Sequence, residues 1–138
     1  MRRQQTQAEW RRAQKSLQAA EILQQSGLAE DAISRAYYAL MHAAKAALLV
    51  HDVIAESHAA VRRLFGQVLV MAAGVEREWA QILARGHDQR GAADYDVDFA
   101  VDEEAADRLV QDAQRFIDRM AVYMMSQGIE LETADNDG

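Results

Sequence analysis

Proline is absent from the whole chain, and this absence constrains the fold more than any other feature of the sequence. An all-β protein needs frequent turns, and proline and glycine are the residues that most often supply them. The seven glycines among the 138 residues are scattered, so we expect an all-α fold. A single domain of this length buries about two-thirds of the surface that its unfolded chain exposes, which is enough for one hydrophobic core.

The composition describes a globular chain. Half of the residues are hydrophobic and 27% are charged, and cysteine is absent, which excludes disulfides, a cysteine nucleophile and a thiolate metal site. The formal net charge is −7, so binding to nucleic acid would depend on a local basic site. No apolar stretch approaches the ~20 residues of a membrane span, and the first residues lack the apolar core of a signal peptide. We therefore expect a cytoplasmic protein.

Five stretches carry apolar residues at helical spacing. The predicted helices are one from Thr6 to the turn at Gly27, one over 29–50, one capped by Ser57, one around Trp79 and one capped by Asp102. The first two are joined by only a few residues and should form an antiparallel hairpin. We predict a single helical domain over 1–128, followed by an acidic, disordered tail over 129–138.

Two further predictions concern where helices begin and end. Thr6 and Glu9 have the spacing of a capping box, in which each side chain bonds the backbone amide of the other residue. The fourth helix should fray at Gly86 and again around Gly91, because glycine is a poor helix former. Residues 92–101 show no helical period, which predicts an ordered, extended loop.

One face of the second helix carries polar side chains that helical spacing places in a line: Asp31, Arg35, Tyr38, His42 and Lys45. Arg35 and His42 are two turns apart, so their side chains can converge on one small group. The planar fork of arginine matches a pair of phosphate oxygens, and histidine is suited to moving a proton near neutral pH. The stripe therefore indicates phosphodiester binding or cleavage. The alternative is an ordinary solvated face with an Asp31–Arg35 ion pair.

Other candidate residues give weaker signals. His58, near the start of the third helix, could donate to a phosphate at the positive end of that helix. His51 and Asp52 lie close to His58 in the sequence, but the three lack the spacing of a metal-ligand set, and no Glu-x-x-His pair occurs. We predict no metal site and no cofactor.

Three segments of the sequence carry a resemblance to a known family. Residues 34–44, SRAYYALMHAA, resemble the signature helix of the HEPN superfamily (higher eukaryotes and prokaryotes nucleotide-binding domains), and are most similar to its small stand-alone prokaryotic branch. The Ser-His pair at 57–58, followed by Leu-Phe-Gly at 64–66, is similar to the third-helix pattern of that branch. Residues 90–95, RGAADY, resemble its Arg-x-x-Ala-Asp-Tyr motif. The resemblance covers roughly residues 10–125.

The resemblance implies an up-and-down bundle of four or five helices, commonly a homodimer, that pairs as a toxin with a minimal nucleotidyltransferase antitoxin. Many HEPN proteins are metal-independent ribonucleases that use an arginine and a histidine separated by four to six residues. Arg35 and His42, with six residues between them, satisfy that spacing. In better-understood members the motif lies later in the chain. Its positional counterpart here is Arg90, after which Tyr95 stands where a histidine would be expected.

Two functions follow as hypotheses. The first is a metal-independent ribonuclease toxin, in which Arg35 binds the scissile phosphate and His42 transfers a proton. The second is a non-catalytic helical module that docks a minimal nucleotidyltransferase or binds a nucleotide. The residues predicted to bind RNA or a nucleotide are Tyr38, His58, Arg90 and Tyr95. A histidine that faces Arg90 in the folded chain would favour the first hypothesis, and His42, His58 and His87 are the candidates.

Overall fold

The computed structural model describes residues 2–95 and 102–132, and the side chains of 93–95 lie outside this description. The helical elements are α1 (Arg3–Gln25), α2 (Ala29–Leu49), α3 (His58–Leu64), η1 (Phe65–Ala72), α4 (Arg77–Tyr95) and α5 (Glu103–Ser126). η1 is a π-helix that continues directly from α3. The described residues contain no strand, so the prediction of an all-α bundle is confirmed. Within these residues, no helix has the length and apolar character needed to cross a membrane.

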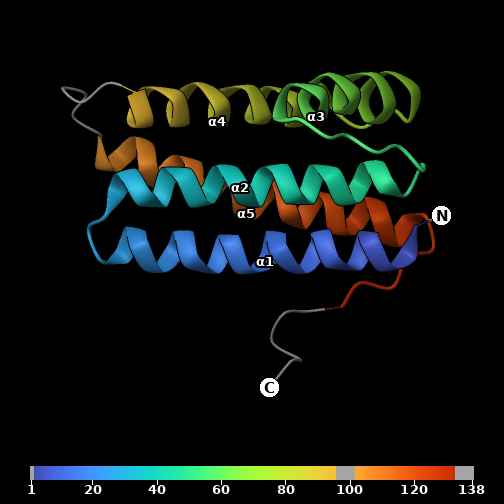
Figure 1. Cartoon of the computed structure of the whole chain (residues 1–138), viewed down its shortest axis with the longest axis horizontal. Coiled ribbons are helices and arrows are strands. Elements are labelled where there is room, and N and C mark those ends of the chain that lie inside the picture. The colour runs from blue at the N-terminus through green and yellow to red at the C-terminus, as the bar shows by residue number, and fades with distance from the viewer. Residues whose placement is uncertain (1, 96–101, 133–138) are drawn as a thin grey trace.

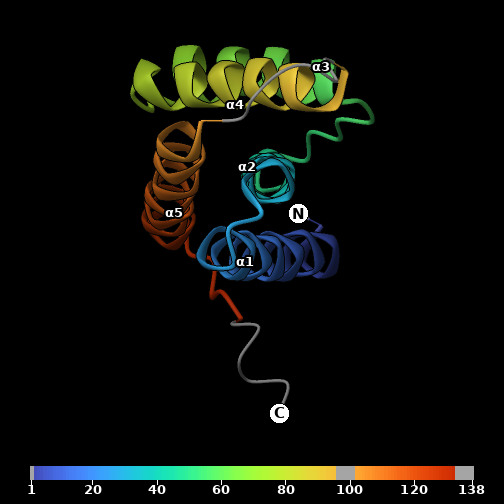
Figure 2. The ribbon, with the colours of Figure 1, turned by 90° about the vertical axis from the view of Figure 1, so that its left-hand side faces the viewer.

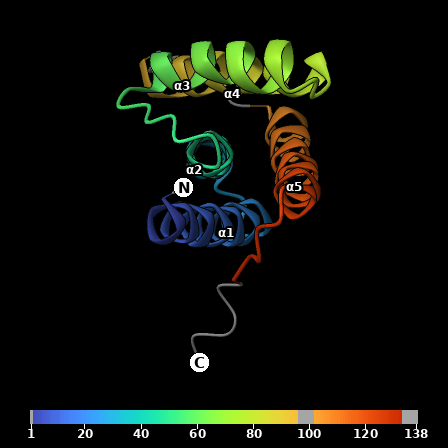
Figure 3. The ribbon, with the colours of Figure 1, turned by 90° about the vertical axis from the view of Figure 1, so that its right-hand side faces the viewer.

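The second helix occupies the centre of the bundle, and α2 contacts every other helical element. Figure 1 shows α1 and α2 as the predicted antiparallel hairpin, with α3 and α4 on the other side of α2. Figures 2 and 3 show that α5 stands beside α2, between the layer of α3 and α4 and the layer of α1. Alanine dominates the buried residues of α2, and fully buried examples are Ala36, Ala39 and Ala43. These small side chains let several helices approach α2 closely.

The fourth helix runs without a break through Gly86 and Gly91 to Tyr95. The predicted fraying is therefore wrong, and so is the loop predicted over 92–95; residues 96–101 lie outside the described residues. Gly86 faces α2, because a Cβ atom built on it would lie 2.9 Å from Cδ1 of Leu40 and 3.3 Å from Cδ1 of Tyr37. The missing side chain thus allows α4 to close onto the central helix.

The predicted caps of α3 and α5 are confirmed. The Ser57 hydroxyl accepts a hydrogen bond from the amide of Ala60, and the Asp102 carboxylate accepts one from the amide of Glu104.

The predicted capping box at the start of α1 is wrong. Because α1 begins at Arg3, Thr6 lies inside the helix, where its buried hydroxyl donates to the carbonyl oxygen of Arg2 over 2.8 Å. Glu9 has no capping role and instead contacts α2.

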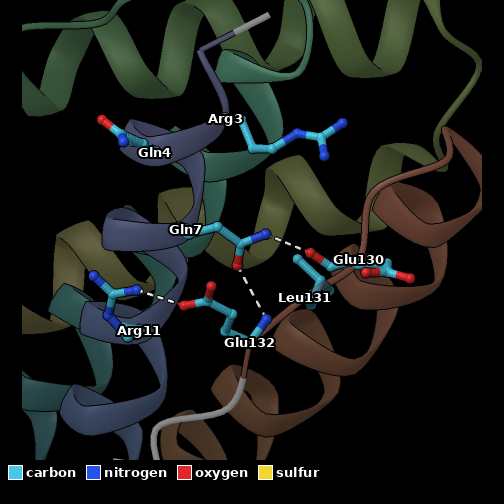
Figure 4. A pocket seen from close by; sticks show the side chains of 7 residues that line it. All are labelled: Arg3, Gln4, Gln7, Arg11, Glu130, Leu131 and Glu132. Carbon is cyan, nitrogen blue, oxygen red and sulfur yellow. Dashed lines mark hydrogen bonds and ion pairs between the residues drawn. The ribbon is translucent and has the colours of Figure 1, made fainter.

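The predicted tail is anchored over its first four described residues, 129–132. Ile129 is buried, the side-chain amide of Gln7 bonds the backbone of Glu130 and Glu132, and Arg11 pairs with the Glu132 carboxylate at 2.7 Å. Figure 4 shows the contacts of Gln7 and Arg11 with this segment. The same residues line a cavity of about 640 Å³. The prediction of disorder does not hold for these four residues, because an apolar side chain and the Gln7 amide attach them to α1. Residues 133–138 lie outside the described residues.

Candidate functional site

Two adjacent tyrosines of α2 form the base of the site. Tyr37 is completely buried, and its hydroxyl accepts a hydrogen bond from Nη1 of Arg62 on α3 over 2.9 Å. Burial raises the pKa of Tyr37, although the charges of Arg62 and Arg90 oppose this rise, so the phenol stays protonated. Tyr38 is partly exposed, and its ring centre lies 6.4 Å from that of Tyr37.

Arg90 reaches from α4 across both tyrosines. Its Nη2 donates to the Tyr38 hydroxyl over 2.9 Å, and its Cζ atom lies 5.0 Å from the ring centre of Tyr38 and 5.5 Å from that of Tyr37. A guanidinium within about 6 Å of a ring centre is attracted to the ring face. The two rings and the hydroxyl therefore hold the Arg90 guanidinium in a defined position.

His58, the first residue of α3, packs edge-on against the same two rings. Its ring centre lies 5.4 Å from that of Tyr37 and 6.1 Å from that of Tyr38. Burial lowers the pKa of His58, and the positive charges of Arg90, Lys45 and others nearby lower it further. The imidazole is therefore neutral near neutral pH and able to accept a proton.

Two histidines thus share the surroundings of Arg90, and of these His58 contacts both tyrosine rings. His87 also lies against the ring of Tyr37, with 6.1 Å between the ring centres. We use the name tyrosine–arginine cluster for Tyr37, Tyr38, His58, Arg62 and Arg90. It is a local concentration of positive charge and aromatic surface on a chain whose net charge is −7.

Two further residues of the polar stripe bind a carboxylate from α1. Nδ1 of His42 lies 2.6 Å from Oε2 of Glu9, and Nζ of Lys45 lies 3.7 Å from Oε1. Burial alone would raise the pKa of Glu9, but the hydrogen bond with His42 and the charges of Lys45, His42 and Arg12 outweigh it and lower the pKa. Glu9 is therefore an ionised, half-buried carboxylate between two helices.

The structure brings together only some of the predicted site residues. Tyr38, His58 and Arg90 meet in the tyrosine–arginine cluster, whereas Arg35 is exposed and makes no hydrogen bond or ion pair with the described residues. Among those residues the alternative ion pair between Asp31 and Arg35 is also not formed. Tyr95 ends α4, and its side chain lies outside the description. No three histidine, aspartate or glutamate side chains in 2–92 and 102–132 gather as a metal site.

Sequence reasoning missed Glu9 and Arg62 as neighbours of the site. Glu9 had a usable signal, because it and Lys45 are equally distant in sequence from the turn at Gly27, which places them level in an antiparallel hairpin. Arg62 had none, since its contact with Tyr37 depends on how α3 lies across α2.

Comparisons with known proteins agree with this fold and sequence. The family model described as the HEPN domain matches residues 6–123. A protein named "Putative toxin" from Methanocaldococcus jannaschii is 37% identical over 108 residues, which cover 78% of this chain and 80% of the relative. A second "Putative toxin" of the same organism is 28% identical over 125 residues, or 91% of this chain and 85% of the relative. A "UPF0332 protein" from Pyrococcus horikoshii is 40% identical over 78 residues, or 56% of this chain and 55% of the relative. Because the family model matches most of the length of this chain, the chain belongs to the HEPN domain family.

Proposed function

We propose that this chain is the RNA-cleaving toxin of a toxin–antitoxin pair, and that it binds and cleaves RNA at the tyrosine–arginine cluster without a metal ion. The observation that carries the proposal is the guanidinium of Arg90, held on Tyr38 with His58 against the same rings. Membership of the HEPN family and the names of two relatives support the toxin role.

The cluster has the groups that RNA recognition needs. The fork of Arg90 matches two oxygens of a phosphate. The partly exposed ring of Tyr38 offers a surface on which a base of single-stranded RNA can stack.

The reaction we propose is attack by the ribose 2′-hydroxyl. Neutral His58 takes the hydroxyl proton, the 2′-oxygen bonds to phosphorus, and the bond from phosphorus to the 5′-oxygen of the next nucleotide breaks. Arg90 stabilises the negative charge that develops on the phosphate oxygens. The departing 5′-oxygen takes up a proton, so the products are a 2′,3′-cyclic phosphate and a 5′-hydroxyl.

Arg35 and His42 form the competing catalytic pair that motif spacing favours. The contacts favour Arg90 over Arg35 as the phosphate ligand, since Arg90 is held by two rings and a hydroxyl while Arg35 is exposed. The second hypothesis, a non-catalytic module that docks a nucleotidyltransferase or binds a nucleotide, would use the same cluster for binding alone.

We further propose a homodimer and a nucleotidyltransferase antitoxin as partners, and a cytoplasmic location. Family membership supports these partners. The contacts of Tyr38 add no support for a dimer, because Arg90 and His58 of the same chain pack against its ring. Sedimentation of the full chain at micromolar concentration should give a mass near two chains. A single species of 15.4 kDa would contradict the dimer.

The test of function is cleavage of a labelled single-stranded RNA by the full chain in excess EDTA. We expect fragments that end in a 2′,3′-cyclic phosphate, and no cleavage when every 2′-hydroxyl is replaced by hydrogen. Arg90→Lys and His58→Gln should each remove cleavage, because the fork and the proton acceptor are lost. Arg85→Lys is the matched control, since Arg85 lies on the same helix and pairs with Asp112 of α5 instead.

Three outcomes would count against the proposal in different ways. Cleavage that needs added magnesium or manganese would contradict the metal-independent reaction. Loss of cleavage in Arg35→Lys but not in Arg90→Lys would show that the phosphate is bound by Arg35, the arginine of the motif pair Arg35 and His42. Binding of RNA without any cleavage would favour the non-catalytic module.

A further inference from the structure

His42 is held by a carboxylate that the proposed function does not use. Nδ1 of His42 and Oε2 of Glu9 are 2.6 Å apart, and the two side chains are 19% and 21% exposed. They belong to α2 and α1, so only the packing of these two helices brings them together. A short contact between two half-buried groups from different helices points to a built pair rather than to a chance surface contact.

Such a contact fixes the imidazole. A carboxylate at Nδ1 accepts the N–H there, which fixes the ring orientation, leaves Nε2 on the far side of the ring for proton transfer, and stabilises the imidazolium when it forms. No described residue forms a hydrogen bond with Nε2 of His42. Among the described residues, His42 thus has a hydrogen-bond partner at Nδ1 and none at Nε2.

The surroundings keep the Glu9 carboxylate charged for this task. Lys45 approaches its second oxygen at 3.7 Å. Arg12, on α1 as well, adds a positive charge, and the pKa of Glu9 is lowered although burial acts to raise it. Glu9 therefore presents a negative charge to His42 at neutral pH.

The pair lies next to the tyrosine–arginine cluster. His42 follows Tyr38 by one turn of α2, on the same stripe of the helix. The charge of His42 is among those that lower the pKa of His58. The two imidazoles therefore lie within electrostatic reach of each other, one on α2 and one at the start of α3.

We propose that Glu9 is a positioning residue that holds His42 as the second proton-transfer group of this site. The inference rests on the ribonuclease function proposed above. His58 takes the proton of the 2′-hydroxyl, and Nε2–H of His42 gives a proton to the 5′-oxygen as its bond to phosphorus breaks. His58 ends the reaction protonated and His42 ends it neutral. Water returns the proton from one to the other.

The test compares Glu9→Gln and His42→Gln with the unaltered chain on two RNAs. In one RNA the scissile linkage is ordinary, and in the other a sulfur atom replaces the bridging 5′-oxygen. A thiolate leaves without protonation because thiols are far more acidic than alcohols. On ordinary RNA we expect both variants to cleave more slowly by about tenfold or more, whereas on the sulfur-linked RNA both should match the unaltered chain.

Controls separate positioning from folding and binding. His58→Gln should remain slow on both RNAs, because it acts on the other proton. Glu21→Gln changes the same charge elsewhere on α1 and should cleave both RNAs normally.

The outcomes distinguish this inference from the proposed function. If the unaltered chain cleaves no RNA, the ribonuclease function itself fails. If the unaltered chain cleaves RNA and Glu9→Gln cleaves ordinary RNA at the same rate, only the role of Glu9 is overturned. A Glu9→Gln rate that stays low on the sulfur-linked RNA would also overturn it, because the defect would then not lie in protonation of the leaving group.

Discussion

The hydroxyl of Tyr37 accepts a hydrogen bond from Nη1 of Arg62 over 2.9 Å, which joins a completely buried side chain of the central helix to the cationic residues of the site. The ring belongs to the core, whereas the hydroxyl belongs to the site.

Two substitutions of Tyr37 separate the contribution of the ring to stability from that of the hydroxyl. Tyr37→Ala should lower the free energy of unfolding by about 3–5 kcal/mol through the cavity it leaves. Tyr37→Phe should lower it by about 1–2 kcal/mol, because only the bond from Arg62 is lost. Urea unfolding followed by circular dichroism measures both, and equal losses would contradict the division.

The tyrosine–arginine cluster makes a prediction about affinity. Tyr38→Phe keeps the ring beneath Arg90 but removes the hydroxyl that accepts from it. We expect RNA binding to weaken by about 1 kcal/mol. Tyr38→Ala also removes the ring and should weaken the free energy of RNA binding by about 1–3 kcal/mol more. Fluorescence anisotropy with a 2′-O-methyl RNA, which cannot react, measures the affinity. The assignment would fail if Tyr38→Ala bound as tightly as the unaltered chain.

Two glycines of α4 should respond to substitution in opposite directions. Gly86 packs against Leu40 and Tyr37, whereas a Cβ atom on Gly91 would meet nothing within 4 Å. Gly86→Val should therefore destabilise the fold by about 1–3 kcal/mol through overpacking. Gly91→Ala should stabilise it by about 0.5–1 kcal/mol, because alanine favours the helix. Thermal unfolding reports both, and stabilisation by Gly86→Val would contradict the close packing of α4 on α2.

The ion pair between Glu76 and Arg119 makes a prediction about pH. The Glu76 carboxylate accepts two hydrogen bonds from Arg119, at 2.7 and 3.0 Å, and one from Trp79 at 2.8 Å. These bonds, those from Arg119 first, lower the pKa of Glu76 from an ordinary 4.5 to about 2. Because the pKa of the folded state is the lower one, the pair stabilises the fold fully above about pH 4.5 and loses its effect as the pH falls to about 2.

Glu76→Gln tests this directly. At pH 7 the variant should be less stable than the unaltered chain, by no more than about 1 kcal/mol because the carboxylate is half exposed. The difference should shrink below pH 4.5 and vanish near pH 2. Urea midpoints measured across this range provide the measurement. A difference that grew on acidification would show that another group is responsible.

The sequence alone predicted those features that depend on residues close together in the chain. The apolar period of the central helix, the caps at Ser57 and Asp102, and the hairpin turn at Gly27 each involve neighbouring residues, and each is confirmed. The family resemblance is confirmed for the same reason, since its motifs are short segments. The capping box at Thr6 was also a local prediction, but it failed because the helix begins earlier, at Arg3.

Only the tertiary structure decided the membership of the site. Glu9 meets His42, Arg62 meets Tyr37, and Arg90 meets Tyr38, and each pair joins two helices. Sequence spacing on one helix favoured Arg35, whose side chain is exposed, because spacing fixes which residues share a face but not which neighbouring helix covers that face. The path of α4 through Gly86 depended in the same way on its packing against Leu40 of α2. Such contacts arise from packing between distant segments. Of these, only the position of Glu9 beside α2 had a signal in the sequence, namely the equal distances of Glu9 and Lys45 from the turn at Gly27.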